Sequence, residues 1–243
     1  MTPKLFIKVS LIVGILLSAT IPSLAEGEVH FIGFNSLKTE NKAHHQETFD
    51  AYIRKLKPIL AKYGVITDVY DVVFGGDGSV KADLVTFGTA KDQESFQAFF
   101  QDPEFHKIFP MLFDALDEHQ VVFTADAFSP DAEAIPDHTF LALNWLKGDV
   151  VEARKEIDVL VEKLAPYNKK YGARKIAFGS GVYSNKGLAT EVVDTVPPQF
   201  VELWSIEDAH GLFEDANAKK IFKQTSAIVE RSESYWLQER KIH

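Results

Sequence analysis

The segment LKPILAKYG, from Leu56 to Gly64, returns later in the chain as LAPYNKKYG, from Leu164 to Gly172. The leucine, proline, lysine, tyrosine and glycine occupy the same places in both segments, without a gap. Two more pairs of segments follow in the same order: residues 31–35 match residues 140–144, and residues 100–109 match residues 213–222. Three matches in one order indicate an internal duplication, so the sequence predicts two copies of one structural unit.

Each copy shows the same succession of hydrophobic patterns and turn signals. A helix is expected where apolar side chains recur every three or four residues, and a strand where apolar runs end in glycine or proline. The first copy is expected to contain strand 29–35, helix 43–63, strands 65–74 and 82–87, helix 92–116 with a break near residues 102–103, and strand 121–128. The second is expected to contain strand 139–145, helix 150–171, strands 174–183 and 200–204, helix 207–229 and strand 232–237.

The order βαββαβ is that of the ferredoxin-like unit, so the predicted fold class is α+β with two tandem units. Such a unit places both helices on one face of its sheet and leaves the other face to be buried. We therefore expect the two sheets to pack face to face as a pseudo-dimeric α+β barrel within one chain. The expected domains are residues 26–128 and 138–243, with residues 129–137 as a linker rich in proline and acidic residues.

The alternation of side chains along the first strand of each copy predicts which residues share a face. Ile32 and Phe34 point one way, and the matching residues in the second copy are Leu141 and Leu143. We expect this apolar set to face the helices. The opposite set ends in an asparagine in both copies and is expected to face a cavity between the sheets.

The N-terminus has the pattern of a secretory signal peptide, covering residues 1–25. Lys4 and Lys8 precede an apolar run, and Pro22 and Ala25 mark its end and the expected cleavage site. The run is short for a membrane span of about 20 residues, so cleavage is favoured over retention as an anchor. The mature chain is therefore expected to be exported, most simply to a periplasm, and to have no membrane contact after cleavage.

The amino-acid composition and net charge limit the classes of partner that are expected for this chain. The formal net charge is −9, and removal of Lys4 and Lys8 with the signal makes it −11. An acidic surface argues against nucleic-acid binding and against attachment to anionic lipid. The chain has no cysteine, which excludes disulfides, thiolate metal ligands and a thiol nucleophile.

The motifs at the helix ends resemble those of the dimeric α+β-barrel superfamily. These motifs are the Pro-x-x-x-Lys-Tyr-Gly end of the first helix and the run from Asp102 to Phe105 in the second. The superfamily includes NIPSNAP-like proteins, antibiotic-biosynthesis-type monooxygenases and several families of unknown function. The resemblance implies a small cavity of apolar to mixed polarity on each sheet, and a duplication that supplies both halves of the usual dimer. It fixes no reaction, because one fold hosts many functions.

Three residues are candidates for chemistry. Asn35 and Asn144 end the first strand of each copy and could project into a cavity, although each could equally cap a strand end. His106 lies four residues after Asp102 on a predicted helix, a spacing that allows contact between the two side chains. It could serve as a general base or remain a partly exposed helix residue.

Aromatic residues on predicted strands are candidates for ligand contacts. Trp145, Trp204 and Tyr70 could line a pocket for a small hydrophobic or mixed-polarity molecule, or belong to an ordinary core. Asp68 and Asp71 on the strand from residue 65 favour an edge or an outward-facing position. No metal or cofactor site is predicted, since the metal-binding, phosphate-binding and dinucleotide motifs are absent.

Three functions follow as hypotheses. The first is a small-molecule-binding protein, with or without cofactor-independent monooxygenase-like activity that uses the substrate's own electrons. The second is a non-catalytic periplasmic ligand carrier or interaction module, because no paired acid and base is visible. The third is haem binding. Haem-degrading monooxygenases resemble this chain in the strand asparagine, but their tryptophan and histidine would fall on Ala98 or Gly211 and on Ile108 or Ile221.

Overall fold

The computed structural model describes residues 27–75, 81–125, 139–187 and 193–242. The predicted signal peptide and linker lie outside these residues. The first half, residues 27–125, contains β1 (Val29–Leu37), α2 (Lys42–Lys62), β2 (Val65–Gly75), β3 (Leu84–Ala90), α3 (Gln93–Gln101), α4 (Pro103–Ile108), α5 (Pro110–Ala115) and β4 (Leu116–Thr124). The second half, residues 139–242, contains β5 (Thr139–Leu146), α6 (Val150–Lys170), β6 (Ala173–Gly179), β7 (Gly181–Lys186), β8 (Val193–Thr195), β9 (Phe200–Ile206), α7 (Ala209–Glu214), α8 (Ala216–Ile228) and β10 (Val229–Glu239).

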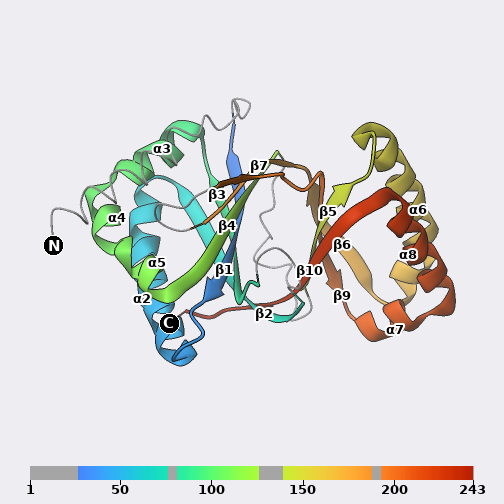
Figure 1. Cartoon of the computed structure of the whole chain (residues 1–243), viewed down its shortest axis with the longest axis horizontal. Helices are drawn as coiled ribbons and strands as arrows, with labels where there is room; N and C mark the ends of the chain where they lie inside the picture. Colours follow the sequence, from blue (N-terminus) through green and yellow to red (C-terminus); the bar gives the residue numbers. More distant parts are fainter. Residues whose placement is uncertain (1–26, 76–80, 126–138, 188–192, 243) are drawn as a thin grey trace.

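The fold is α+β, with one large antiparallel sheet and helices outside it (Figure 1). The strand order is β6-β9-β5-β10-β2-β3-β1-β4-β7-β8. Within it, the order β4-β1-β3-β2 in the first half corresponds to β10-β5-β9-β6 in the second. The helices of the two halves lie at opposite ends of the molecule in this view, with the strands between them. Among the described residues, no helix has the length and apolar character needed to cross a bilayer.

Two strands of the second half reach across to the first. The single strand predicted from residue 174 to residue 183 is divided at Ser180: β6 pairs with β9, whereas β7 pairs with β4. The last strand, β10, pairs with β5 along most of its length and with β2 near its end. A short strand that the sequence did not predict, β8, pairs with β7. Main-chain hydrogen bonds therefore join the halves at two places.

The contact between β10 and β2 also explains an acidic residue on β2. Asp71 does not lie on an edge strand, because β2 has β3 on one side and β10 on the other. Its carboxylate accepts a hydrogen bond from Arg240, which also binds the carboxylate of Asp50 on α2 through Nε and a terminal nitrogen, at 2.9 and 2.8 Å. Of the two predicted alternatives, an edge or an outward-facing position, the edge is therefore wrong for Asp71. The charge is balanced by a guanidinium from the other half of the chain.

The apolar residues of the first strands face the opposite way from the prediction. Ile32, Phe34, Leu141 and Leu143 are all buried in one cluster that both halves share. Tyr235 of β10 joins them, with its ring centroid 5.0 Å from that of Phe34. We call this set, together with the further members of the cluster, the shared core; those members are Tyr70, Ala82, Val85, Phe87, Val122, Trp145, Val201, Leu203 and Leu237.

The correction has a physical reason. The side of the strands away from the helices packs against the same side of the other half, and two pleated faces interdigitate best with apolar side chains alone. The other side is covered by helices, which leave spaces between them. Polar side chains can therefore be accommodated on that side. Phe31 accordingly packs on the helix side of the first half, and Phe140 on that of the second.

The second helical segment of the first half is broken twice. The predicted break at Asp102 is present, and Pro110 adds a second one, so that α3, α4 and α5 are short. The chain then enters β4 at Leu116, five residues earlier than predicted. Proline lacks the amide hydrogen that a continuing helix needs, which accounts for both breaks. The early start places residues 116–120 on a strand.

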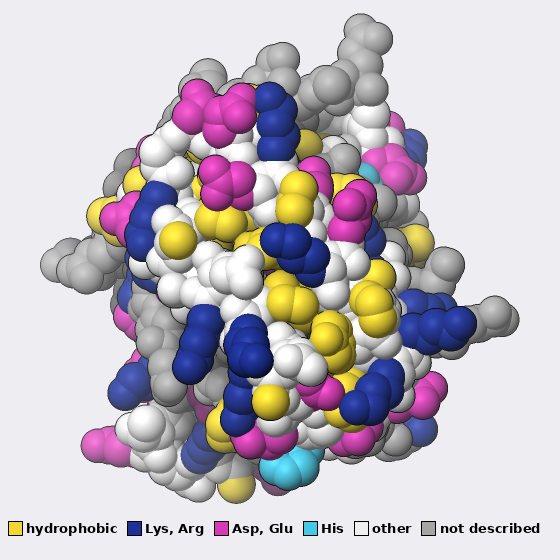
Figure 2. Space-filling model, turned by 90° about the vertical axis from the view of Figure 1, so that its right-hand side faces the viewer, with side chains coloured by type: hydrophobic (Ala, Val, Ile, Leu, Met, Phe, Trp, Pro, Cys, Tyr) yellow, Lys and Arg dark blue, Asp and Glu magenta, His cyan; other side chains and the backbone are white. Residues whose placement is uncertain are grey.

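The outer face of the second half carries mixed charges (Figure 2). Lysine and arginine side chains lie among aspartate and glutamate side chains, with hydrophobic ones between them. Val150, Val151 and Val159 of α6 are among the exposed hydrophobic residues. Scattered exposed hydrophobic residues of this kind are normal on a soluble surface.

The repeated motif at the end of the first helix has the same hydrogen bonds in both halves. Tyr63 donates its hydroxyl to Asp102 at 2.9 Å, and Tyr171 donates to Asp215 at 2.9 Å. Each aspartate also caps a helix, because Asp102 accepts from the amide of Glu104 and Asp215 from the amides of residues 217 and 218. The tyrosine thus fixes the end of one helix against the start of another.

Both motif glycines have the left-handed backbone that commonly ends a helix. The φ angle is 64° at Gly64 and 63° at Gly172. A Cβ added at Gly172 would lie 2.5 Å from the carboxylate of Glu207, whereas one at Gly64 would lie 3.3 Å from the nearest atom of Lys91.

We predict that Gly64→Val and Gly172→Val each lower the free energy of unfolding by about 1–2 kcal/mol, since a left-handed residue with a Cβ is strained by that amount. Urea denaturation of the purified variants measures the effect. Ala61→Val, at an exposed position in the last turn of α2, is the matched control and should cost about 0.5 kcal/mol. Glycine variants no less stable than this control would contradict the assigned helix ends.

Candidate functional site

Each half contains a cavity between its helices and its sheet. The first-half cavity has a volume of about 160 Å³ and the second-half cavity about 220 Å³. They occupy matching places, because Asn35 lies opposite Leu84 in the first half and Asn144 lies opposite Phe200 in the second. The predicted asparagines therefore do line cavities, one each. The cavities lie on the helix side of the sheet, however, and not between the sheets as predicted.

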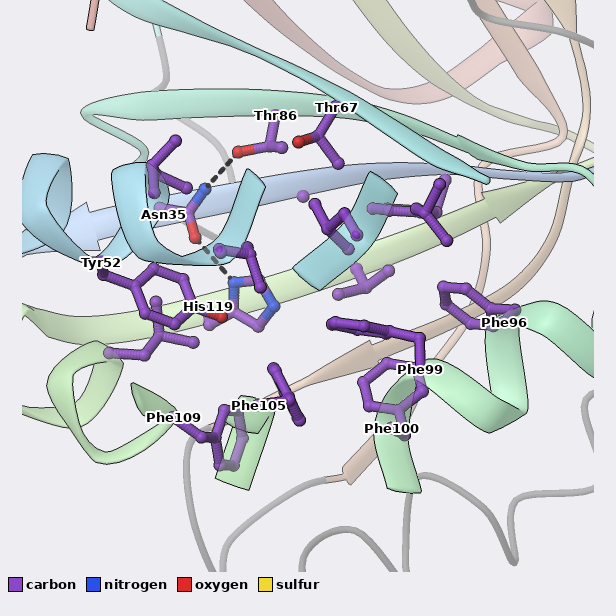
Figure 3. A pocket seen from close by; sticks show the side chains of 18 of the residues that line it. Asn35, Tyr52, Thr67, Thr86, Phe96, Phe99, Phe100, Phe105, Phe109 and His119 are labelled. Carbon is purple, nitrogen blue, oxygen red and sulfur yellow. Dashed lines mark hydrogen bonds between the residues drawn. The ribbon is translucent and has the colours of Figure 1, made fainter. Parts of the chain in front are cut away.

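The first-half cavity is almost entirely aromatic and aliphatic (Figure 3). Figure 3 shows rings from α3, α4 and the turn between α4 and α5 gathered on one side, with polar groups of the strands on the other. Asn185, on β7 of the second half, also contributes to the wall. The aromatic residues that line it are Phe31, Phe49, Tyr52, Phe96, Phe99, Phe100, Phe105, Phe109, Phe113 and Phe123.

A hydrogen-bonded pair, Asn35 and His119, forms the polar side of this cavity. The Asn35 amide nitrogen donates to the carbonyl of Leu84 at 3.4 Å and to the hydroxyl of Thr86 at 3.3 Å. A carbonyl can only accept, so this contact fixes the orientation of the amide. Its oxygen, Oδ1, is then the acceptor for His119 Nδ1 at 2.9 Å. The imidazole proton resides on Nδ1, and Nε2 keeps a lone pair.

The electrostatics of the pair keep the imidazole neutral. Burial lowers the pKa of His119 from 6.5 to about 4, against a smaller upward effect of the Phe34 carbonyl. No side chain of the described residues bonds to Nε2. Thr67, which also lines the cavity, has a buried hydroxyl without a hydrogen-bond partner among the described residues. The first-half cavity therefore offers a neutral acceptor and a free hydroxyl in apolar surroundings.

The second-half cavity has a carboxyl group as its polar centre. Asn144 donates its amide to Glu202 Oε2 at 3.4 Å, and the Trp204 indole donates to Oε1 at 3.3 Å. Ser232 completes the set by donating to Asn144 Oδ1 at 2.8 Å. Burial raises the pKa of Glu202 to about 7, although the hydrogen bond from Trp204 and the charges of nearby cations lower it.

The strand registers show which residues correspond between the cavities. Gly33 and Thr86 face each other across β1 and β3, as Ala142 and Glu202 do across β5 and β9. Thr86 therefore corresponds to Glu202. His119 lies opposite Asn35 just as Ser232 lies opposite Asn144. The two cavities share the asparagine and differ in both of its neighbours.

The other predicted site residues are divided among three places. Trp204 lines the second-half cavity. Trp145 and Tyr70 belong to the shared core and not to either cavity. His106 lies on α4 outside the residues that line the cavities, and the Asp102 carboxylate is bonded to Tyr63, Lys62 and the amide of Glu104.

Two functional candidates were missed. His119 was not considered because the strand that holds it was expected to begin at Val121. Glu202 did have a signal in the sequence, since it is the one charged residue in the otherwise apolar run from Phe200 to Trp204. Among the described residues, no cluster of histidine, aspartate and glutamate is placed to hold a metal ion.

Comparison with known proteins identifies the fold. No protein-family model matches the chain, and no curated protein matches its sequence. Chlorite dismutase from Candidatus Nitrospira defluvii, in complex with imidazole, is 10% identical with a TM-score of 0.54, over 88% of this chain and 92% of that chain. An anthrone oxidase-like protein is 13% identical, with a TM-score of 0.49 over 88% and 92% of the two chains. A candidate monooxygenase from Lactobacillus acidophilus NCFM is 12% identical, with a TM-score of 0.46 over 87% and 93%.

The chain therefore shares the fold of this chlorite dismutase, which is consistent with the resemblance that the sequence motifs suggested. At this level of identity the likeness concerns the fold alone. The match to chlorite dismutase extends over most of both chains, so both halves of the present chain take part in it.

The two half-buried groups with shifted pKa values, His119 and Glu202, should make stability depend on pH in opposite ways. His119 has a pKa of about 4 in the folded protein, against an ordinary value of 6.5. Its contribution to the free energy of unfolding is therefore present above pH 6.5 and is lost as pH falls to 4. Glu202 has a raised pKa of about 7 against 4.5, so the folded state binds the extra proton and loses stability as pH rises from 4.5 to 7.

Because of His119, the free energy of unfolding of the wild type should rise by up to about 3 kcal/mol between pH 4 and 6.5, and we predict that His119→Gln removes this rise. Glu202→Gln should remove a decrease of about the same size between pH 4.5 and 7. Urea denaturation of wild type and both variants at closely spaced pH values measures the two differences. Parallel curves for all three proteins would contradict the assigned burial of these groups.

Proposed function

We propose that this chain is an exported small-molecule-binding protein whose first-half cavity holds a flat, neutral molecule with one hydrogen-bond donor. The observation that carries the proposal is the neutral imidazole of His119, held in one tautomer by Asn35 inside an aromatic cavity. Nε2 has no side-chain partner among the described residues, which favours a ligand that donates a hydrogen bond to it.

The size of the cavity limits the ligand. A dry cavity of about 150 Å³ is known to bind benzene, so about 160 Å³ accommodates one aromatic ring with a small substituent. The ligand class is therefore that of phenol, with its hydroxyl directed to Nε2. A second polar substituent could bond to Thr67, whose hydroxyl has no partner in the described residues.

The two halves are proposed to be copies of one ferredoxin-like unit, residues 26–128 and 138–243, whose sheets form a pseudo-dimeric barrel. The equal strand order of the halves supports this, and so does the repeated pairing of Tyr63 with Asp102 and of Tyr171 with Asp215. The single residue between β6 and β7 supports closure, because those strands lie near opposite ends of the strand order.

Expression of the two halves as separate chains tests this arrangement. Each half alone exposes its share of the shared core, so we predict that both fragments aggregate or self-associate. Their co-expression should give a soluble one-to-one complex, measurable by light scattering. Two well-behaved monomeric halves would contradict the proposal.

Export rests on the N-terminal sequence, and the proposed site of cleavage follows Ala25. Mass spectrometry of the protein recovered from a periplasmic extract tests it, with Glu26 as the expected first residue. An intact Met1 in the membrane fraction would instead indicate a retained anchor.

A monooxygenase-like activity is the second candidate, and the resemblance of the helix-end motifs to those of antibiotic-biosynthesis-type monooxygenases favours it. In such a reaction the substrate supplies the electrons, one oxygen atom of O₂ enters it and the other leaves as water. The pKa of His119, about 4, makes proton removal from a phenol near neutral pH unfavourable by several units. The first-half cavity is thus better suited to holding a ligand than to activating it, which favours a carrier.

We predict that phenol binds about fivefold more tightly than benzene, since one hydrogen bond contributes about 1 kcal/mol. The preference should be constant from pH 5.5 to 8.5, because His119 is neutral throughout. Isothermal titration calorimetry on the mature chain measures it, and oxygen uptake in the same mixture reports any oxidation.

His119→Leu should abolish the preference for phenol and retain benzene. His210→Gln, a change at an exposed histidine of the other half, is the control and should behave as wild type. Equal affinity of the wild-type protein for phenol and benzene would exclude His119 as the acceptor. Stoichiometric oxygen uptake would favour the monooxygenase over the carrier.

A further inference from the structure

We propose that the second-half cavity is a separate site that binds an apolar amine in its protonated form, with the ammonium paired to the carboxylate of Glu202. A short arylalkylamine represents the ligand class. The inference does not rest on the function of the first-half cavity, because it uses a different wall, a different polar group and a different half of the chain.

The charge of the cavity is the first argument. Glu202 is the only ionisable side chain among the described residues that line it. Asn144 and Trp204 each donate to one carboxyl oxygen, at 3.4 and 3.3 Å, which orients the group but adds no charge. A carboxylate in apolar surroundings is costly unless it is paired. A cation that enters this cavity meets a single negative partner already held in place.

The walls provide the second argument. Five aromatic residues line the cavity, and the face of an aromatic ring attracts a cation. Phe213 stacks near Phe222 with centroids 5.4 Å apart, and near Phe140 at 6.0 Å. The remaining two are Phe200 and Trp204. Rings combined with one carboxylate suit a ligand that joins an apolar body to an ammonium.

Two cations outside the cavity lie close enough to influence Glu202. Arg154 of α6 stacks 4.6 Å above the ring of Phe200 and donates to the hydroxyl of Ser180 at 3.0 Å. Lys175 of β6 lies 4.0 Å from the ring of Phe178. Both stabilise the carboxylate, yet desolvation outweighs them and leaves the pKa of Glu202 raised. The charge is therefore only partly compensated, and room remains for a cation inside the cavity.

The first-half cavity provides a contrast within the same chain. Thr86, not a carboxylate, occupies the place of Glu202, and the ionisable residues of the wall are His119 and Tyr52. His119 stays neutral at physiological pH because of its low pKa. Among the described residues that line it, that cavity has no carboxylate to pair with a buried ammonium. The two cavities should therefore select ligands by charge, neutral in the first and cationic in the second.

Two isosteric probes test the proposal on the full mature chain. A volume of about 220 Å³ accommodates a benzene ring with a two-carbon side chain. We expect 2-phenylethylamine to bind at least about tenfold more tightly than 2-phenylethanol at pH 8.5, a difference that corresponds to about 1.4 kcal/mol. Calorimetry measures both affinities. Equal affinity for the two probes would overturn the proposal.

The pH dependence identifies the partner group. With a pKa of about 7, only a small fraction of Glu202 is ionised at pH 5.5, so amine binding should be about thirtyfold weaker there than at pH 8.5. Binding at pH 6 should release about one proton, which calorimetry in buffers of different ionisation enthalpy detects. Affinity that does not change with pH would contradict a role for Glu202.

Glu202→Gln should bind the two probes with equal affinity at every pH, and it should fold because the neutral form of the residue is already favoured by burial. Glu230→Gln, which removes the same charge from an exposed position on β10, is the matched control and should retain the preference for the amine. A Glu202→Gln protein that still prefers the amine would overturn the proposal, as would loss of the preference in Glu230→Gln.

Discussion

The bare face of each half is the constraint on which the rest of this structure depends. Helices cover one side of the strands only, so the other side must find an apolar partner or remain exposed to water. The partner here is the opposite half, and Ile32, Phe34, Leu141 and Leu143 are buried between them. At about 25 cal/mol for each Å² of apolar surface removed from water, such a contact is a large stabilising contribution. Two strands of the second half, β7 and β10, form main-chain hydrogen bonds with strands of the first half and fix how the halves are arranged.

This packing decides where ligands can bind. Because the shared core takes the purely apolar face of the first strands, Asn35 and Asn144 must point to the helices. Broken helices cover that side less completely than a second sheet would, and a cavity remains in each half. A buried polar group next to such a space cannot be solvated freely, and its properties shift accordingly. The unusual pKa values of His119 and Glu202 are thus consequences of the same layer arrangement that stabilises the molecule.

Structural features that depend only on residues close together in the chain were predicted well from the sequence. The helix ends at Gly64 and Gly172 were predicted because a helix end is a local event, and the bounds of α6 differ from the expected helix by a single residue. The orientation of the strand faces was predicted wrongly, because alternation shows which residues share a face and not what covers it. His119 escaped notice because residues 117–120 are all polar and give no strand pattern, although β4 begins at Leu116 directly after α5. Glu202 was readable as a lone charge in an apolar strand, but its significance depends on a cavity formed by residues far away in the sequence.

One chain carries both cavities, and this gives it a freedom that a symmetric pair of identical subunits does not have. In a homodimer every substitution is made twice, so the two sites stay alike and any change must suit both. Here Thr86 and Glu202, or His119 and Ser232, occupy corresponding places and differ. Each cavity can accumulate substitutions while its counterpart keeps its own residues, and a mutation harmful to one need not harm the other. A single gene thus encodes two cavities with different walls. Either cavity can specialise without a second gene.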